Sequence, residues 1–192
     1  GFYSYYLMPE KMASHWNIEG QVDGYVSKNF GVFFMPSLLL FLAIVLLLVP
    51  NIDPLKKNIE KFKDDYEMFI VWFVVFFFYL YVLTLLWNMG AVFNMNNMLM
   101  PAFGIFFYYI GILLEKAKRN FFIGIRTPWT LSSDKVWDKT HKLGGKLLKL
   151  SGLLALISIF FSGYAFFFVF IPIISFSLIL VIYSYFQFRK NP

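Results

Sequence analysis

The 192-residue sequence contains no cysteine, which excludes disulfides, thiolate metal sites and cysteine nucleophiles. Charged residues are also scarce at 15%, whereas soluble domains usually carry about 25%. Only two histidines occur, with neither an HExxH motif nor another paired-histidine spacing typical of zinc enzymes. A Ser-His-Asp motif and a glycine-rich phosphate loop are lacking as well. We therefore expect neither catalytic activity nor a cofactor.

Apolar residues, by contrast, make up 59% of the chain and lie in long charge-free runs, a pattern typical of bilayer-spanning helices. The run from Leu150 to Phe188 would extend roughly 58 Å as a single helix, nearly twice the thickness of the hydrocarbon core. It is therefore predicted to form a helical hairpin that turns at Ser162-Gly163-Tyr164. The predicted fold class is an all-α, polytopic membrane helix bundle. Its five expected spans are residues 30–49, 68–87, 99–114, 146–161 and 165–188.

Two features of the apolar segments carry further expectations. Gly104 and Gly111 lie inside the third span, where small residues allow helices to pack closely. The stretch from Phe2 to Met8 is apolar but too short to span a membrane. We interpret this stretch as the end of a truncated first helix.

Lysine and arginine alternate between low and high numbers along the loops. The number of these residues is two, four, none and nine in segments 1–29, 50–67, 88–98 and 115–149, and two in the C-terminal tail. The positive-inside rule then predicts a multi-pass protein of the cell membrane, with residues 1–29 outside and the C-terminus in the cytoplasm. A net charge of +6 could indicate binding of nucleic acid, but the positive-inside rule already accounts for it, so direct binding of nucleic acid is not expected. Membrane lipid is an expected partner.

The outer segment, residues 1–29, contains turn-forming glycines among polar and aromatic side chains, which suits a compact cap at the membrane surface. One interpretation is a ligand-recognition surface built on His15, Trp16, Asn17, Asp23 and Tyr25. The alternative is a folded loop whose polar side chains bond backbone groups. A metal at His15 is a third possibility, which would need Glu10, Glu19 or Asp23 as co-ligands.

The basic segment at residues 115–149 contains a second group of candidates. Its predicted partner-binding residues are Arg126, Thr127, Pro128, Trp129, Trp137 and His141. The segment is interpreted either as a docking site for a cytoplasmic partner or anionic lipid headgroups, or as an amphipathic anchor at the membrane surface.

Within this basic segment, Ser132, Ser133 or Asp134 can cap the start of a short helix. Trp137, His141 and Gly144 then lie on one face of that helix, because they are spaced by four and three residues. The pair Gly144-Gly145 is predicted to form a hinge before the next span.

Two motif blocks carry a resemblance to known proteins. The first resembles a bacterial and archaeal membrane domain of uncharacterised function and comprises Met8-Pro9, His15-Trp16-Asn17, Gly20, Asp23-Gly24-Tyr25 and Lys28. The second is similar to the signature of the SdpI-type (sporulation-delaying-protein) immunity family and comprises Gly124 to Leu131, Trp137, Thr140-His141 and Gly144. Both blocks occur in this order in the immunity proteins of that family.

The resemblance implies an N-terminal membrane domain at residues 1–114 and an SdpI-like domain at residues 115–192. The latter is expected to contain a cytoplasmic loop at 115–146 and a helical hairpin at about 147–188. A six-helix protein is implied, which agrees with a truncated first helix.

The founding member of the family protects its producer from a secreted toxic peptide and holds a transcriptional repressor at the membrane. The resemblance thus implies a secreted peptide toxin as the partner of the outer motif and a cytoplasmic repressor as the partner of the inner motif. The alternative is a small transporter or flippase with an uncharged pore, because the predicted spans contain no Asp, Glu, Lys, Arg or His in their interiors.

Overall fold

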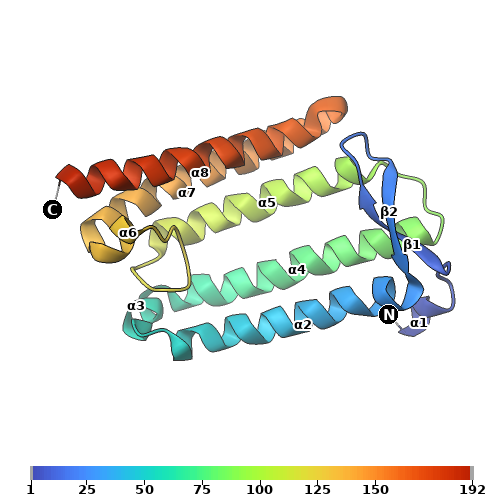
Figure 1. Cartoon of the computed structure of the whole chain (residues 1–192), viewed down its shortest axis with the longest axis horizontal. Helices are drawn as coiled ribbons and strands as arrows, with labels where there is room; N and C mark the ends of the chain where they lie inside the picture. Colours follow the sequence, from blue (N-terminus) through green and yellow to red (C-terminus); the bar gives the residue numbers. More distant parts are fainter. Residues whose placement is uncertain (1, 191–192) are drawn as a thin grey trace.

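The computed structural model describes residues 2–190, and over this range five long helices lie side by side with a β-hairpin across one end (Figure 1). The long helices are α2 (Lys28–Ile52), α4 (Lys63–Asn88), α5 (Met95–Lys116), α7 (Asp134–Ile157) and α8 (Ala165–Lys190). Each belongs to a segment that is long and apolar enough to cross a membrane. The predicted polytopic membrane helix bundle is therefore confirmed.

A two-stranded antiparallel sheet is the feature of the fold that the sequence analysis does not anticipate. It consists of β1 (Lys11–Trp16) and β2 (Val22–Ser27), within the segment that was predicted to form a cap. The shorter helical elements are α1 (Phe2–Tyr5), α3 (Lys56–Ile59), α6 (Pro128–Ser132) and the 3-10 helices η1 (Glu60–Phe62), η2 (Ser158–Phe160) and η3 (Ser162–Tyr164). The turn predicted between the last two spans is confirmed, because η3 occupies it and α8 begins at the next residue.

Helix α5 packs closely against α7 through glycines that are seven residues apart on each helix. A methyl group added at Gly104 would lie 2.8 Å from the carbonyl oxygen of Gly152, and one added at Gly111 would lie 2.7 Å from that of Gly145. Real side chains do not approach backbone oxygens so closely, so these positions require glycine. The close packing predicted for Gly104 and Gly111 is confirmed.

The predicted hinge at Gly144-Gly145 is wrong. Helix α7 runs without interruption from Asp134 to Ile157, so the last part of the expected cytoplasmic loop is the first part of a spanning helix. Glycine normally weakens a helix, but both residues are buried here. Gly145 contacts α5, and Gly144 lies against the side chains of Ile125 and Leu180. Tertiary packing therefore offsets the low helix propensity of the pair.

The two ends of the bundle differ in their charge and in their connections. One end, called the hairpin end, carries β1 and β2. The other, called the loop end, carries α3, α6 and the α5–α7 loop at residues 117–133 (Figure 1). Two ion pairs join neighbouring helices near the loop end: Lys116 Nζ lies 2.6 Å from Asp65 of α4, and Lys149 Nζ lies 2.8 Å from Glu115 of α5. The basic segments identified in the sequence thus share one end of the molecule.

The outer surface of the bundle is apolar along the spanning helices. Large side chains such as Leu40 of α2 and Leu178 of α8 are more than half exposed. A surface of this kind is unfavourable in water and suits contact with lipid chains. Buried clusters lie toward each end instead. Met12 of β1 packs with Val32 and Tyr81 at the hairpin end, and Ile59, Phe62 and Tyr66 pack near the loop end.

Candidate functional site

Two asparagines fasten the hairpin to the helices below it. Asn88, the last residue of α4, accepts a hydrogen bond from Ala13 N at 2.7 Å and donates one to Ala13 O at 3.0 Å. Asn96, in the first turn of α5, donates to the carbonyl oxygens of Asn17 and Ile18 at 3.1 and 2.9 Å. The amide of Asn88 therefore occupies the outer edge of β1 as a neighbouring strand would.

Asn17 shapes the tip of the hairpin. Its side-chain oxygen accepts from the backbone N–H groups of Glu19 and Gln21 at 3.0 and 2.9 Å. Gly20 completes the turn with φ of 79°, a left-handed conformation that glycine adopts without strain. Asn17 thus bonds backbone groups, as the alternative interpretation of this segment expects.

His15, Asp23 and Tyr25 form the exposed part of the outer candidate set. His15 Nδ1 lies 2.5 Å from Asp23 Oδ1 across the two strands, and their side chains are 70% and 46% exposed. Tyr25 is 60% exposed. The structure therefore joins His15 to Asp23 and leaves these two residues and Tyr25 exposed on the hairpin, where they are accessible to a ligand.

A metal at His15 would need ligands from the neighbouring carboxylates. Glu10 lies 3.6 Å from Lys28. Among residues 2–190 there is no group of three or more His, Cys, Asp or Glu side chains close enough to hold a metal ion. The pair of His15 and Asp23 supplies two donors, fewer than the three or four protein ligands of zinc sites.

Trp16 lies between the hairpin and the helices. Its ring packs edge to face with Trp87 at 5.7 Å between centroids. Its indole nitrogen is buried and has no hydrogen-bond partner in the described part of the chain. Trp16 and His15 also line a cavity of about 450 Å³ that is bordered by Phe30 and Phe34 of α2. The hairpin therefore forms one wall of a mostly apolar cavity.

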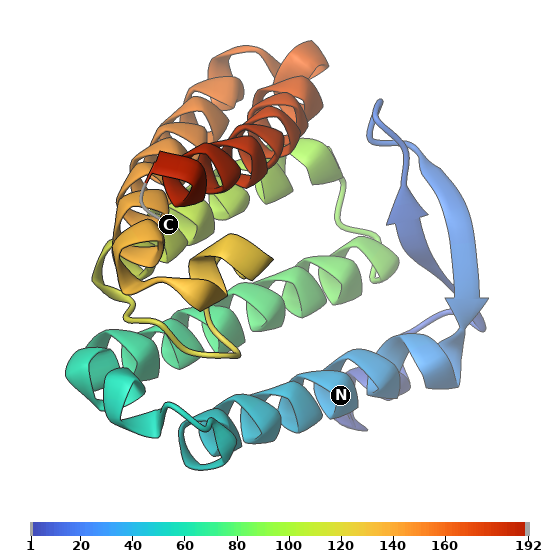
Figure 2. The same ribbon diagram turned by 60° about the vertical axis from the view of Figure 1, so that its left-hand side comes forward.

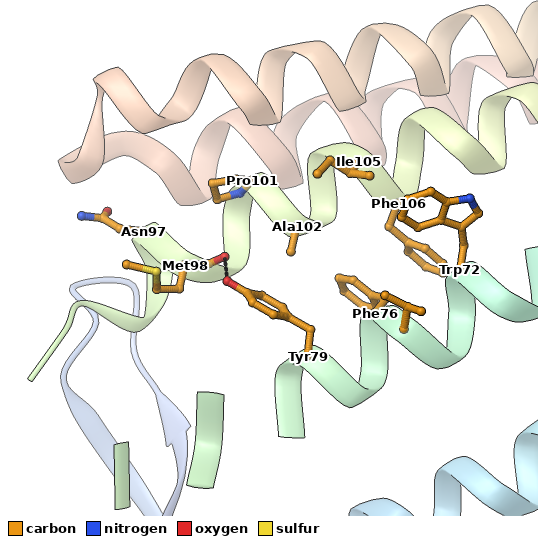
Figure 3. A pocket seen from close by; sticks show the side chains of 10 residues that line it. Trp72, Phe76, Tyr79, Asn97, Met98, Pro101, Ala102, Ile105 and Phe106 are labelled. Atoms are coloured by element: carbon orange, nitrogen blue, oxygen red, sulfur yellow. Dashed lines mark hydrogen bonds between the residues drawn. The ribbon is translucent and has the colours of Figure 1, made fainter. Parts of the chain in front are cut away.

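A second cavity of about 420 Å³ lies between α4 and α5 within the spanning region (Figure 3). Trp72 and Phe76 approach it from α4, and Pro101 and Phe106 from α5. Tyr79 O–H donates to the carbonyl oxygen of Met98 at 3.1 Å, so its polar group is already engaged. The lining offers apolar contact and no arrangement of acid, base or nucleophile.

The α5–α7 loop is organised by a buried asparagine and a buried aspartate, neither of which was among the predicted residues. Asn120 donates to the carbonyl oxygens of Lys118 and Ile123 and accepts from the N–H groups of Phe122 and Ile123. Asp53 accepts from Phe121 N at 2.8 Å. The sequence signal was weak, because a polar residue beside aromatic ones does not reveal which backbone groups it will satisfy.

Trp137 and His141 form the support on which this loop rests. Both are buried, at 0% and 1% exposure, and their rings stack at 3.9 Å. Trp137 Nε1 donates to the carbonyl oxygen of Ala117 at 2.9 Å. His141 Nε2 accepts from Ile125 N at 2.9 Å, and Nδ1 lies 2.9 Å from the Trp137 carbonyl oxygen. These partners assign the neutral tautomer with the proton on Nδ1.

Gly124 is the residue that allows the loop to lie on this support. Its φ of 119° is disfavoured for other residues, and a methyl group added there would collide with His141 Nε2. The second motif block begins with Gly124 and Ile125, and both contact the ring of His141 through their backbone. This contact explains why the block requires glycine at its first position.

Thr127 and Pro128 begin the short helix α6. Thr127 and Thr130 form a capping box, in which each side chain accepts from the other residue's backbone N–H. Thr127 Oγ1 is also 3.0 Å from Ser184 Oγ of α8. Ser133 caps the start of α7, in agreement with one of the three predicted positions. Thr127 thus ties the loop to the last helix.

Arg126, Pro128 and Trp129 form the accessible part of the inner candidate set. Arg126 and Pro128 are exposed, whereas Trp129 is half-buried with its ring 5.2 Å from that of Tyr185. Arg126 Nη1 donates to the carbonyl oxygen of Phe121 at 2.7 Å. In this conformation the other three predicted residues are buried inside the loop end.

The chain is similar to known proteins over most of its length. Residues 116–184 match the SdpI/YfhL protein family, and residues 1–40 match a domain of unknown function, DUF1648. The chain is 25% identical over 187 residues to the immunity protein SdpI of Bacillus subtilis strain 168, covering 97% of this chain and 87% of that protein. No solved structure matches the chain. The resemblance inferred from the two motif blocks is thus confirmed: the C-terminal part of the chain is similar to the SdpI/YfhL family and the N-terminal part to DUF1648.

Proposed function

We propose that this protein is an integral membrane immunity protein that protects its cell against a secreted toxic peptide. The observation that carries this proposal is the similarity to an immunity protein over 97% of the chain. The apolar lining of the cavity between α4 and α5 agrees with a role in binding.

The proposal assigns the hairpin end to the outside of the cell and the loop end to the cytoplasm. Its support is the position of the basic segments, which lie at the end opposite the hairpin, together with the positive-inside rule. Because the chain has no cysteine, single cysteines can be introduced at exposed positions on either end.

A membrane-impermeant maleimide tests this orientation in intact cells. Glu19→Cys at the hairpin tip should be labelled, whereas Lys135→Cys at the start of α7 should be labelled only after the cells are permeabilised. Labelling of Lys135→Cys alone in intact cells would reverse the orientation.

The outer recognition surface consists of His15, Asp23 and Tyr25, which are exposed together, and Trp16 beside them. We further propose that a cytoplasmic repressor is a second partner of this protein. It would dock on Arg126, Pro128 and Trp129. Tryptophan and arginine contribute strongly to binding at protein interfaces, which favours these exposed side chains over the buried ones nearby.

The immunity proposal is tested by expression in a bacterium that is sensitive to secreted antimicrobial peptides. Cells that produce the wild-type protein should survive at least one peptide that kills cells with the empty vector. The double variant Asp23→Ala/Tyr25→Ala, which changes only exposed side chains, should lose most of this protection at equal membrane abundance. Unchanged killing across a broad peptide panel would contradict immunity.

A further inference from the structure

One edge of the outer hairpin has no partner in the described structure. Asn88 bonds both the N–H and the C=O of Ala13, so these groups point away from β2. Ala13 pairs with Tyr25, and this pair is therefore of the type that exchanges no hydrogen bonds. The N–H and C=O of Tyr25 consequently point away from β1, toward the outer edge of β2.

The neighbouring residues agree with this alternation. Lys28 N donates to Glu10 O at 3.0 Å, which makes that pair a hydrogen-bonded one. Ser27, one residue before Lys28, pairs with Lys11 and directs its N–H outward like that of Tyr25. The edge of β2 thus presents the N–H and C=O of Tyr25 and the N–H of Ser27 in an extended conformation.

The position of β2 leaves this edge accessible. In Figure 2 the darker strand β1 lies between β2 and the helices, and the outer edge of β2 faces away from them. The edge of β1, by contrast, is covered by Asn88 at the end of α4. Open strand edges readily accept another extended chain, and proteins usually cover them.

Apolar side chains beside β2 supply what a bound strand needs in addition to backbone partners. Val26 of β2 lines the cavity beside the hairpin, together with Phe30 and Phe34, whose rings stack at 4.3 Å and are each more than 40% exposed. Alternate side chains of a strand point to opposite faces. A strand added to β2 therefore directs every second side chain to the face of the sheet that carries Val26, beside which Phe30 and Phe34 are exposed.

Charges on the hairpin favour a basic group in the added chain. Asp23 of β2 and Glu19 at the tip are both exposed. The nearby His15 is the partner of Asp23, but its ring carries a positive charge only when it is protonated. A lysine or arginine near the tip end of the added strand meets carboxylates rather than other cations.

We propose that the free edge of β2 binds an extended, apolar peptide segment as a third strand, with alternate side chains on the face of the sheet that carries Val26, beside Phe30 and Phe34. Recognition by strand addition takes its affinity from main-chain hydrogen bonds and its specificity from pockets for alternate side chains. This inference rests on the proposed function in one respect, namely that the natural occupant is the secreted toxic peptide.

The test uses the full-length protein in lipid nanodiscs and a labelled synthetic peptide that alternates valine with threonine and carries one lysine. Fluorescence anisotropy measures the Kd. Tyr25→Pro removes the central N–H of the edge and should bind at least about tenfold more weakly than Tyr25→Ala, which keeps it. Lys11→Pro is the control, because it places a proline at the start of β1, on the edge that faces away from the peptide. This variant should bind the peptide with a Kd within threefold of wild type.

A change in the peptide provides the second arm, because Tyr25→Pro can also disturb the hairpin. The same peptide with N-methyl groups at alternate residues keeps its side chains but loses the N–H groups of one edge. Wild-type protein should bind it at least about tenfold more weakly. Equal binding of the methylated peptide, or no binding of the parent peptide, would overturn strand addition.

Two further outcomes separate this inference from its alternatives. If Tyr25→Cys forms a disulfide-linked dimer in membranes without peptide, the edge belongs to a second copy and the inference is wrong. If Tyr25→Pro retains full protection against a toxin, strand addition fails while immunity stands. If the synthetic peptide binds as described but no toxin is neutralised, the binding edge stands and the proposed function fails.

Discussion

The motif residues at the two ends of this molecule differ in their exposure to solvent. At the hairpin end, the motif residues His15, Asp23 and Tyr25 remain on the surface. At the loop end, Trp137 and His141 face inward and serve the backbone of the loop. A motif of distinctive residues can therefore belong to a partner-binding surface or to the internal support of a loop. The exposure of its side chains distinguishes these two roles.

The largest expected loss of stability follows substitution of Gly124, where the backbone of the α5–α7 loop lies on His141. Gly124→Ala adds both strain at positive φ and a collision with the ring, which together should destabilise the protein by about 2–4 kcal/mol. Gly90→Ala is the matched control, because Gly90 also has positive φ but open space around it. Thermal unfolding of both variants in detergent, followed by tryptophan fluorescence, should rank Gly124→Ala well below Gly90→Ala. Equal midpoints would mean that the loop does not rest on His141.

A slightly smaller loss of stability is expected from a substitution between the two ends, where α5 packs against α7. Gly145→Ala places a methyl group against the Gly111 carbonyl and the Glu115 side chain, and should cost about 1–3 kcal/mol. Gly163→Ala, with open space at the turn, should change stability little. The same unfolding assay compares them, and a stable Gly145→Ala variant would contradict the close approach of the helices.

The attachment of the hairpin should be weaker than the packing of the loop. Asn88→Ala removes both hydrogen bonds to Ala13 and should loosen the hairpin at a cost of about 1–2 kcal/mol. Hydrogen exchange of residues 11–27 should become faster in this variant and remain unchanged in Asn97→Ala, whose side chain is exposed. Unaltered exchange in Asn88→Ala would show that other contacts hold the hairpin.

The smallest effect on stability is expected at His15. Its pair with Asp23 is exposed, and pairs of this kind contribute at most about 1 kcal/mol. His15→Ala should therefore unfold within a few degrees of wild type while reducing protection against the toxin. A large loss of stability would show that His15 is structural, like His141, and would remove the contrast between the two ends.

The spans and the final turn were predictable because they depend on local properties of the sequence. Long apolar runs identify the helices, and the run after Leu150 is too long for one crossing, which correctly located the turn at residues 162–164. Gly104 and Gly111 indicated close packing for the same reason, since small residues have few other roles in a span.

What could not be predicted depends on contacts between distant residues. The strands of the hairpin are short, and β1 is held by Asn88, which lies 75 residues away in the sequence. The glycine pair at 144–145 indicates a hinge in isolation, but it is helical here, where α5 packs against Gly145 and Leu180 of α8 lies beside Gly144. Likewise, Trp137 looks like a surface anchor until its partner, the Ala117 carbonyl, is known.

The most direct test of the account is the survival of toxin-treated cells that produce hairpin-end or loop-end variants at equal membrane abundance. The account predicts that Asp23→Ala/Tyr25→Ala cells die while Arg126→Ala/Trp129→Ala cells survive as well as wild type, because only the hairpin end meets the toxin. Survival of the hairpin variant together with death of the loop variant would contradict the division of roles between the two ends.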